Sequence, residues 1–138
     1  MDINSIRSEI ITKMEELKPL TFLMVESFAG QLADVPAFVK KMPACLVHFG
    51  GVDFSEYSMH PLKAYETVVP FEIYVFTDVK RYKSKNIDTI ESVVGTALEK
   101  IVEIQQITLK SVKQAWADNE FLSYVINVDY IPNEVING

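Results

Sequence analysis

The stretch "VVPFEIYVFTDVKRYKSKNIDTIESVVGTALEKI", residues 68–101, contains a strand pattern, a cluster of positive charge and a helix pattern, in that order. Side chains alternate along residues 67–79, as in a strand whose successive residues point to opposite faces. One face carries Phe71, Ile73, Val75 and Val79, and the other carries Glu72, Tyr74, Phe76 and Asp78. Because Tyr74 and Phe76 also need cover from solvent, we expect both faces to be at least partly buried. The pattern predicts a long central strand.

The second half of this stretch has the spacing of a helix. After the charged cluster, apolar residues recur every three or four positions, which places them on one helical face: Ile87, Ile90, Val94, Leu98 and Ile101. Asn86 is expected to supply the N-cap oxygen. Asp88 suits the positive N-terminal end of the helix dipole, and Lys100 suits the negative end.

Other elements are indicated on both sides of this stretch. The stripe Ile3, Ile6, Ile10, Met14 and Leu17 predicts an N-terminal helix that Asp2 or Asn4 caps and Pro19 ends. Strand patterns follow at residues 20–26, 44–49, 107–114 and 122–131, with a short helix from about Asp34 to Pro43.

Three details of these strands are also expected. Gly50-Gly51 should close the strand of residues 44–49, because positive φ costs glycine little. Residues 53–64 should form a long loop or an excursion of the sheet. The last strand should have one wet face, formed by Ser123, Asn127 and Asp129.

This order of elements predicts an α+β fold. We expect a mixed, mainly antiparallel sheet of four to five strands, with two long helices packed on one side and a short extra helix. The chain has 138 residues, of which 49% are hydrophobic and 23% charged. These values are typical of one folded domain, so a single domain spanning residues 1–138 is expected.

The charge balance is acidic, with a formal net charge of −6 and a pI near 4.9. This argues against general nucleic-acid binding, which depends on Lys and Arg neutralising phosphates. Cys45 is the only cysteine, so no intramolecular disulfide forms and a reducing compartment is expected. The N-terminus lacks the apolar stretch of a secretory signal, and the longest uncharged apolar run, residues 19–25, is too short to cross a bilayer. We therefore expect a soluble protein without a membrane partner.

No pattern of residues predicts catalysis, a cofactor or a metal ion. The lone glycine pair lacks the further glycines or the lysine of a phosphate-binding loop. The two histidines, His48 and His60, are not spaced as metal ligands. His48 lies near Cys45 and Asp53 in the sequence, but an ordinary hydrogen-bonded histidine in a sheet is favoured over a nucleophilic site, which needs a positioned base.

The basic cluster of Lys80, Arg81, Lys83 and Lys85 has three interpretations. It can be a solvated connection whose charges keep the strand end from pairing with other chains. It can bind phosphate at the start of the following helix, although Asp88 would repel an anion there. It can also bind a partner with an acidic surface. Another copy of this chain, with its 19 Asp and Glu residues, is one such partner.

A second candidate interface lies in residues 51–64. Phe54, Tyr57 and Met59 occur in this segment, and aromatic residues and methionine are enriched where proteins meet. We predict that these three residues and the basic cluster contact partners.

Three motifs follow the amphipathic N-terminal helix: MPACLVHFGG at residues 42–51, FEIYVF at residues 71–76, and the basic turn with Arg81 that leads into the helix of residues 87–102. In this order of motifs the sequence resembles the small tail proteins of Mu-like phages and prophages. It also resembles the tail-terminator fold typified by the lambda minor tail protein U. The likeness covers nearly the whole chain.

The resemblance implies a structural subunit without enzymatic activity or a cofactor. Such proteins form a hexameric ring at the head-proximal end of the tail tube, stop its polymerisation and bind head-completion proteins. The implied location is the virion tail, after assembly in the bacterial cytoplasm. DNA would meet the ring only in passing through its lumen, and we expect the basic cluster to lie at a ring face or at the lumen.

Two other functions fit the same residues. One is a small ligand-binding or regulatory α+β module of bacterial origin without catalytic activity, with residues 50–64 at the rim of its pocket. The other, which is the least favoured, is a small hydrolase that uses His48, Asp53 or His60.

Overall fold

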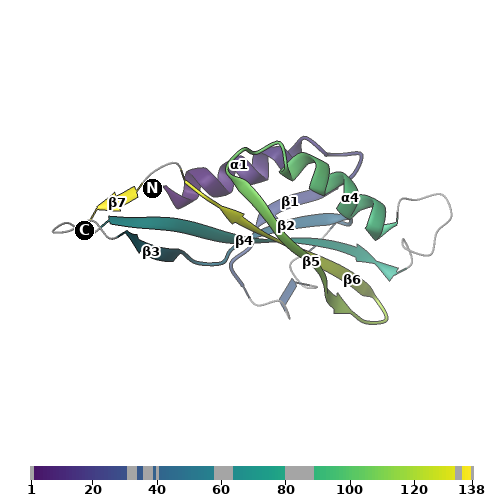
Figure 1. Cartoon of the computed structure of the whole chain (residues 1–138). Coiled ribbons are helices and arrows are strands. Elements are labelled where there is room, and N and C mark those ends of the chain that lie inside the picture. The colour runs from purple at the N-terminus through teal and green to yellow at the C-terminus, as the bar shows by residue number, and fades with distance from the viewer. Residues whose placement is uncertain are drawn as a thin grey trace.

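The structure is a computed structural model, and it describes residues 2–30, 34–35, 39, 41–57, 64–79, 89–132 and 135–137, without the side chains of residues 56–57, 64–65 and 135–137. The described chain forms an α+β fold with a mixed sheet (Figure 1). Its helices are α1 (Ile3–Glu15) and α4 (Ile90–Ile101). Its strands are β1 (Met24–Ser27), β2 (Ala44–Phe49), β3 (Asp53–Tyr57), β4 (Ala64–Asp78), β5 (Ile107–Ala117), β6 (Phe121–Tyr130) and β7 (Val135–Asn137).

β4 is the central strand of the sheet. The main order is β1-β2-β4-β6-β5, and β3 and β7 also pair with β4. β1 and β2 run parallel, and the other described pairs are antiparallel. The predicted central strand is confirmed, although it begins at Ala64. The predicted number of four to five strands fits the main order but is too low for the whole sheet, because β3 and β7 extend it.

β2 and β3 follow the same side of β4 and are separated by a bulge. Phe49 lies opposite Phe71, but Asp53 lies opposite Val68, so the path from β2 to β3 contains one residue more than the facing part of β4. Gly51, within this path, has a φ of +109°. An extra residue of this kind is a β-bulge, which bends a strand and changes its direction. The glycine pair therefore follows the end of β2 at Phe49, as predicted, and pairing with β4 resumes in β3.

β3, the first part of β4 and β7 form an arm at one end of the sheet. In Figure 1, β7 and the start of β4 project beyond the N-terminal end of α1. β3 pairs with residues 64–68 of β4, and β7 pairs with residues 64–66 on the other side. Of the two alternatives expected for residues 53–64, the described part is an excursion of the sheet.

The two helices pack on one face of the sheet and bury the main core (Figure 1). Most of the predicted apolar stripes are confirmed, since the buried residues include Ile6, Ile10 and Met14 of α1 and Ile90, Val94 and Ile101 of α4. They meet inward-facing residues of the central strands: Cys45, Val47, Phe71, Ile73, Val75, Ile126 and Val128. No helix in the described ranges is long and apolar enough to cross a membrane.

The predicted start of the second helix is wrong. α4 begins at Ile90, and its N-cap is Thr89 rather than Asn86. The Oγ1 atom of Thr89 accepts a hydrogen bond from the backbone N–H of Ser92 at 3.4 Å. Asn and Thr both suit a cap, and Thr89 has the extended backbone conformation that this position requires. At the N-terminus, Asp2, one of the two expected caps, is the N-cap of α1.

The opposite face of the sheet carries a smaller core, made of Val35, Val39, Ala44, Leu46 and Phe76. Ser123 of β6 lies opposite Phe76 and is fully buried. The prediction that Ser123 belongs to a wet face is therefore wrong, because chain that precedes β2 covers this end of the sheet. Residues 36–38 and 40 of the short helix expected from about Asp34 to Pro43 lie outside the described residues.

Candidate functional site

The predicted interface residues are described only in part. Phe54 lies in β3 and is 57% exposed. Tyr57 is the last residue of β3, and its side chain lies outside the description. Met59 and the basic cluster of Lys80, Arg81, Lys83 and Lys85 also lie outside the described residues.

β4 connects the two predicted interface regions. It starts in the arm at Ala64 and ends at Asp78, shortly before the basic cluster in the sequence. Its 15 residues rise roughly 3.3 Å each and so span about 50 Å. The arm and the residue that leads into the basic cluster therefore lie at opposite ends of one strand.

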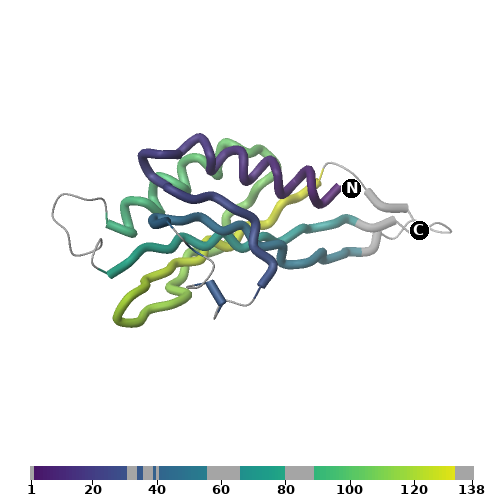
Figure 2. The backbone as a smooth tube through the Cα atoms, turned by 180° about the vertical axis from the view of Figure 1, so that it is seen from behind, coloured from purple at the N-terminus to yellow at the C-terminus, as the bar shows by residue number. Residues whose placement is uncertain are grey.

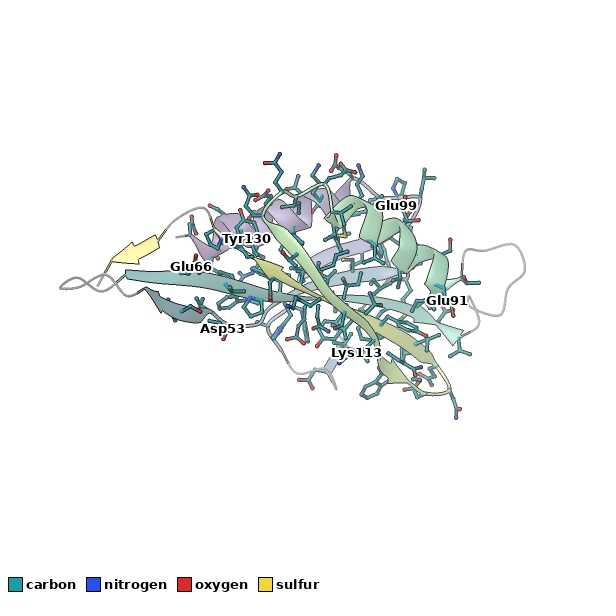
Figure 3. All side chains as sticks on the ribbon, viewed as in Figure 1. Asp53, Glu66, Glu91, Glu99, Lys113 and Tyr130 are labelled. Carbon is teal, nitrogen blue, oxygen red and sulfur yellow. The ribbon has the colours of Figure 1, made fainter. Side chains whose placement is uncertain are left out.

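The described side chains of the arm combine acidic groups with an exposed aromatic ring. Asp53 and Glu66 are exposed carboxylates (Figure 3). Phe54 lies opposite Thr67, so the two side chains share a face of the arm. The sequence has no Lys or Arg between Lys41 and Lys63. The arm is thus an acidic projection that presents Phe54 to solvent.

A hollow of about 280 Å³ lies beside β1, and we refer to it as the β1 hollow. Its lining combines apolar side chains with charged ones: Lys18, Leu23, Met24, Val25, Glu26 and Lys41. Leu20, in the same turn between α1 and β1, is 94% exposed. Within the described chain, β1 pairs with β2 alone, so the β1 hollow lies at an edge of the sheet.

His48, Glu72 and Tyr74 form a hydrogen-bonded cluster on the face of the sheet away from the helices. His48 lies directly opposite Glu72 in the register of β2 and β4. Oε1 of Glu72 is 3.2 Å from Nδ1 of His48, and the Tyr74 hydroxyl donates to Oε2 of Glu72 at 2.8 Å. Both carboxylate oxygens are engaged, so Glu72 orients both rings. Sequence reasoning missed Glu72, because only the strand register places it beside His48.

The surroundings of these groups change their ionisation. Burial, the hydrogen bond to Glu72 and the charge of Glu72 raise the pKa of Tyr74 to about 12. Burial also raises the pKa of the Cys45 thiol. Cys45 belongs to the helix-side core, whereas His48 points to the other face of β2. The Cys-His pair considered from the sequence therefore does not form.

His48 lines two hollows near Phe28. One, of about 220 Å³, also contacts Arg7, Ser27, Ala29 and Phe49. The other, of about 140 Å³, also contacts Gly30 and Tyr74. A carboxylate-oriented imidazole can exchange protons or bind a small polar ligand.

Among the described residues, no group of three His, Cys, Asp or Glu side chains is placed to hold a metal ion. Asp53 is the first residue of β3, on the other side of the bulge from His48. His60 lies outside the described residues.

No protein-family model matches this chain, and no curated protein matches it.

Proposed function

We propose that this chain is a structural subunit of a phage or prophage tail: a tail terminator or tail-completion protein without catalytic activity. It forms a homo-oligomeric ring that caps the tail tube and binds head-completion proteins. The resemblance carried by residues 42–51, by residues 71–76 and by the turn with Arg81 supports this proposal, as does the α+β fold with a mixed sheet and two helices.

The observation that carries the proposal is the separation of charge along β4. The acidic arm with Phe54 lies at one end of this strand, and the sequence continues from the other end into Lys80, Arg81, Lys83 and Lys85. Different, complementary surfaces on one subunit favour head-to-tail association, which generates closed rings when the rotation closes. In the assembled virion, the basic cluster lies at a ring face or at the lumen.

Co-assembly with the tail-tube protein encoded in the same gene cluster tests the proposal. The protein should form rings of about six copies, measured by light scattering and electron microscopy, and should stop tube growth at a defined length. Reversing the charge of the four basic residues to Glu should weaken assembly or head joining, whereas Lys113→Glu, an exposed lysine on β5, should not. Unrestrained tube growth in the presence of the wild-type protein would contradict the proposal.

The second candidate function is a small ligand-binding or regulatory module. The His48–Glu72–Tyr74 cluster favours it, because these three residues position polar groups beside two hollows. An NMR screen with small carboxylates and phosphates would follow the imidazole signals of His48 in the isolated protein. Saturable shifts at His48 that are lost in Glu72→Gln would favour the ligand-binding module. A protein that assembles into rings and shows no such shifts would favour the tail subunit.

A further inference from the structure

We propose that the arm of one subunit docks into the β1 hollow of a second copy of this chain. The Phe54 ring enters the hollow, and the carboxylates of the arm lie against its two lysines. This inference rests on the proposed function, because it supplies the contact between neighbouring subunits of the ring.

The β1 hollow suits an aromatic side chain in size and chemistry. Its volume of about 280 Å³ exceeds the roughly 150 Å³ that holds a benzene molecule in a protein interior. Leu23, Met24 and Val25 give it an apolar wall. Phe54 is 57% exposed on the arm, and an aromatic ring that fills an apolar pocket is typical of the energetic centre of an interface.

Charge complementarity selects the arm as the occupant. Lys18 and Lys41 line the β1 hollow together with one carboxylate, Glu26, so these three residues leave a net positive charge. Neither lysine forms an ion pair within the described part of the chain. Asp53 precedes Phe54 directly, and β3 contains Glu56 as well but no basic residue. Docking therefore brings the acidic strand to two lysines that have no ion-pair partner among the described residues.

The contact must join two copies, because the arm of a subunit is far from its own hollow. The arm extends beyond the N-terminal end of α1 (Figure 1), whereas Lys18 and Leu23 follow the C-terminal end of α1, at the other end of this helix (Figure 2). The 13 residues of α1 span about 20 Å at 1.5 Å per residue. Since the two contact surfaces differ, the association is head-to-tail and can close into a ring or continue as a filament.

Cysteine crosslinking between copies tests this contact. Ser55→Cys and Leu23→Cys variants are purified separately, mixed at high concentration and treated with a short bis-maleimide. Ser55 is the exposed neighbour of Phe54 in β3, so this variant keeps the Phe54 ring. The native Cys45 is fully buried, so the wild-type protein serves as the unreactive control. Leu109→Cys on β5 is the matched control for Leu23→Cys, because Leu109 is 42% exposed and Leu23 39%. We expect crosslinked dimers from the 55–23 mixture at a yield at least tenfold above the 55–109 mixture.

The outcomes separate this inference from the proposed function. Rings that form while the 55–23 yield stays at the level of the 55–109 control would overturn the docking and leave the tail function standing. A strong 55–23 crosslink in open dimers or filaments would support the docking and count against a terminating ring. If the protein shows no self-association and no crosslinking, both the docking contact and the proposed tail function are overturned.

A charge exchange provides a second readout on the same surface. Lys18→Glu combined with Lys41→Glu should weaken self-association at least tenfold, measured by sedimentation velocity. Adding Asp53→Lys on the arm should restore part of this loss. Circular dichroism checks that each variant keeps its fold. If the double lysine variant associates like the wild type, the docking contact is wrong.

Discussion

Gly51 has a backbone conformation that a side chain would strain. Its φ is +109°, and no described residue other than glycine has a positive φ. Beyond its two chain neighbours, a Cβ atom added to Gly51 would meet no described atom within 4 Å, whereas one added to Gly50 would come to 3.0 Å from the carbonyl oxygen of Pro70. Any effect of substituting Gly51 therefore reports on the backbone of the bulge alone.

Gly51→Ala is expected to lower the free energy of unfolding by about 1–2 kcal/mol, because positive φ brings Cβ against the backbone. Gly95→Ala is the matched control, since Gly95 lies within α4 and an added Cβ there also meets nothing within 4 Å. Alanine favours a helix interior, so this variant should gain about 0.5–1 kcal/mol. Urea denaturation measures both values. If the free energy of unfolding changes in the same direction in both variants, the positive φ of Gly51 is not what stabilises the bulge.

Tyr74 should ionise at a higher pH than a tyrosine in the unfolded chain. Its pKa is raised to about 12, first by burial and then by Glu72. In the unfolded chain a tyrosine titrates near 10, so the folded state holds this proton more tightly. The stability linked to Tyr74 is therefore fully present below pH 10 and is lost as the pH rises toward 12.

Ultraviolet titration of phenolate absorbance tests this expectation. Tyr74→Phe should remove a step near pH 12. Glu72→Gln should lower the pKa of Tyr74 but leave it above 10, because burial is the larger cause. A Tyr74 that titrates near 10, as a tyrosine does in the unfolded chain, would mean that Glu72 and the sheet do not shield its hydroxyl.

At the level of elements, Asp118 organises the turn between β5 and β6. Its Oδ1 accepts the backbone N–H groups of Glu120 and Phe121, each at 2.7 Å. Its Oδ2 accepts the indole N–H of Trp116 at 2.9 Å. These hydrogen bonds, with that from Phe121 first, hold the pKa of Asp118 below its usual value of 3.8. One exposed carboxylate thus joins the end of β5 to the start of β6.

Asp118→Ala is therefore expected to lower the melting temperature, because three donors lose their acceptor. The folded pKa is lowered, so the stabilisation is present above pH 3.8 and is lost as the pH falls further. The difference in melting temperature between the wild type and Asp118→Ala should accordingly shrink between pH 6 and pH 2.5. Glu120→Ala, an exposed change in the same turn, should have little effect at any pH. A pH-independent difference would assign the effect to packing rather than to the carboxylate.

The elements that the sequence predicted well are those with a clear period. The alternation in β4 and the stripe of α1 each match one regular geometry, so their buried faces could be assigned from the pattern. Boundaries were harder: Asn86 and Thr89 are both good caps, and the sequence alone does not rank them. A positive-φ glycine can end a strand or form a bulge in it. The presence of Gly51 in the sequence therefore did not predict that pairing with β4 resumes in β3.

Across the whole molecule, the polar face of the sheet depends on register. His48 lies opposite Glu72, Glu72 opposite Asn127, and Asn127 opposite Ser111. The Asn127 amide donates to the Ser111 hydroxyl at 3.0 Å, so polar side chains continue across four strands. These residues lie far apart in the sequence, and a shift of one position would move each to the helix side. This is why the sequence identified His48 as a candidate but not its partner Glu72.

The reactivity of Cys45 should report on unfolding of the whole molecule. Its side chain is fully buried in the core between the helices and the sheet, and burial raises the pKa of its thiol. A thiol reagent should therefore react only with opened molecules, at a rate set by their equilibrium population when closing is fast. Gly51→Ala, which destabilises the chain far from Cys45 by about 1–2 kcal/mol, should then accelerate the reaction about 5–30-fold. Gly95→Ala should slow it. If both variants react at the wild-type rate, the layer of α1 and β1 opens locally, without unfolding of the sheet.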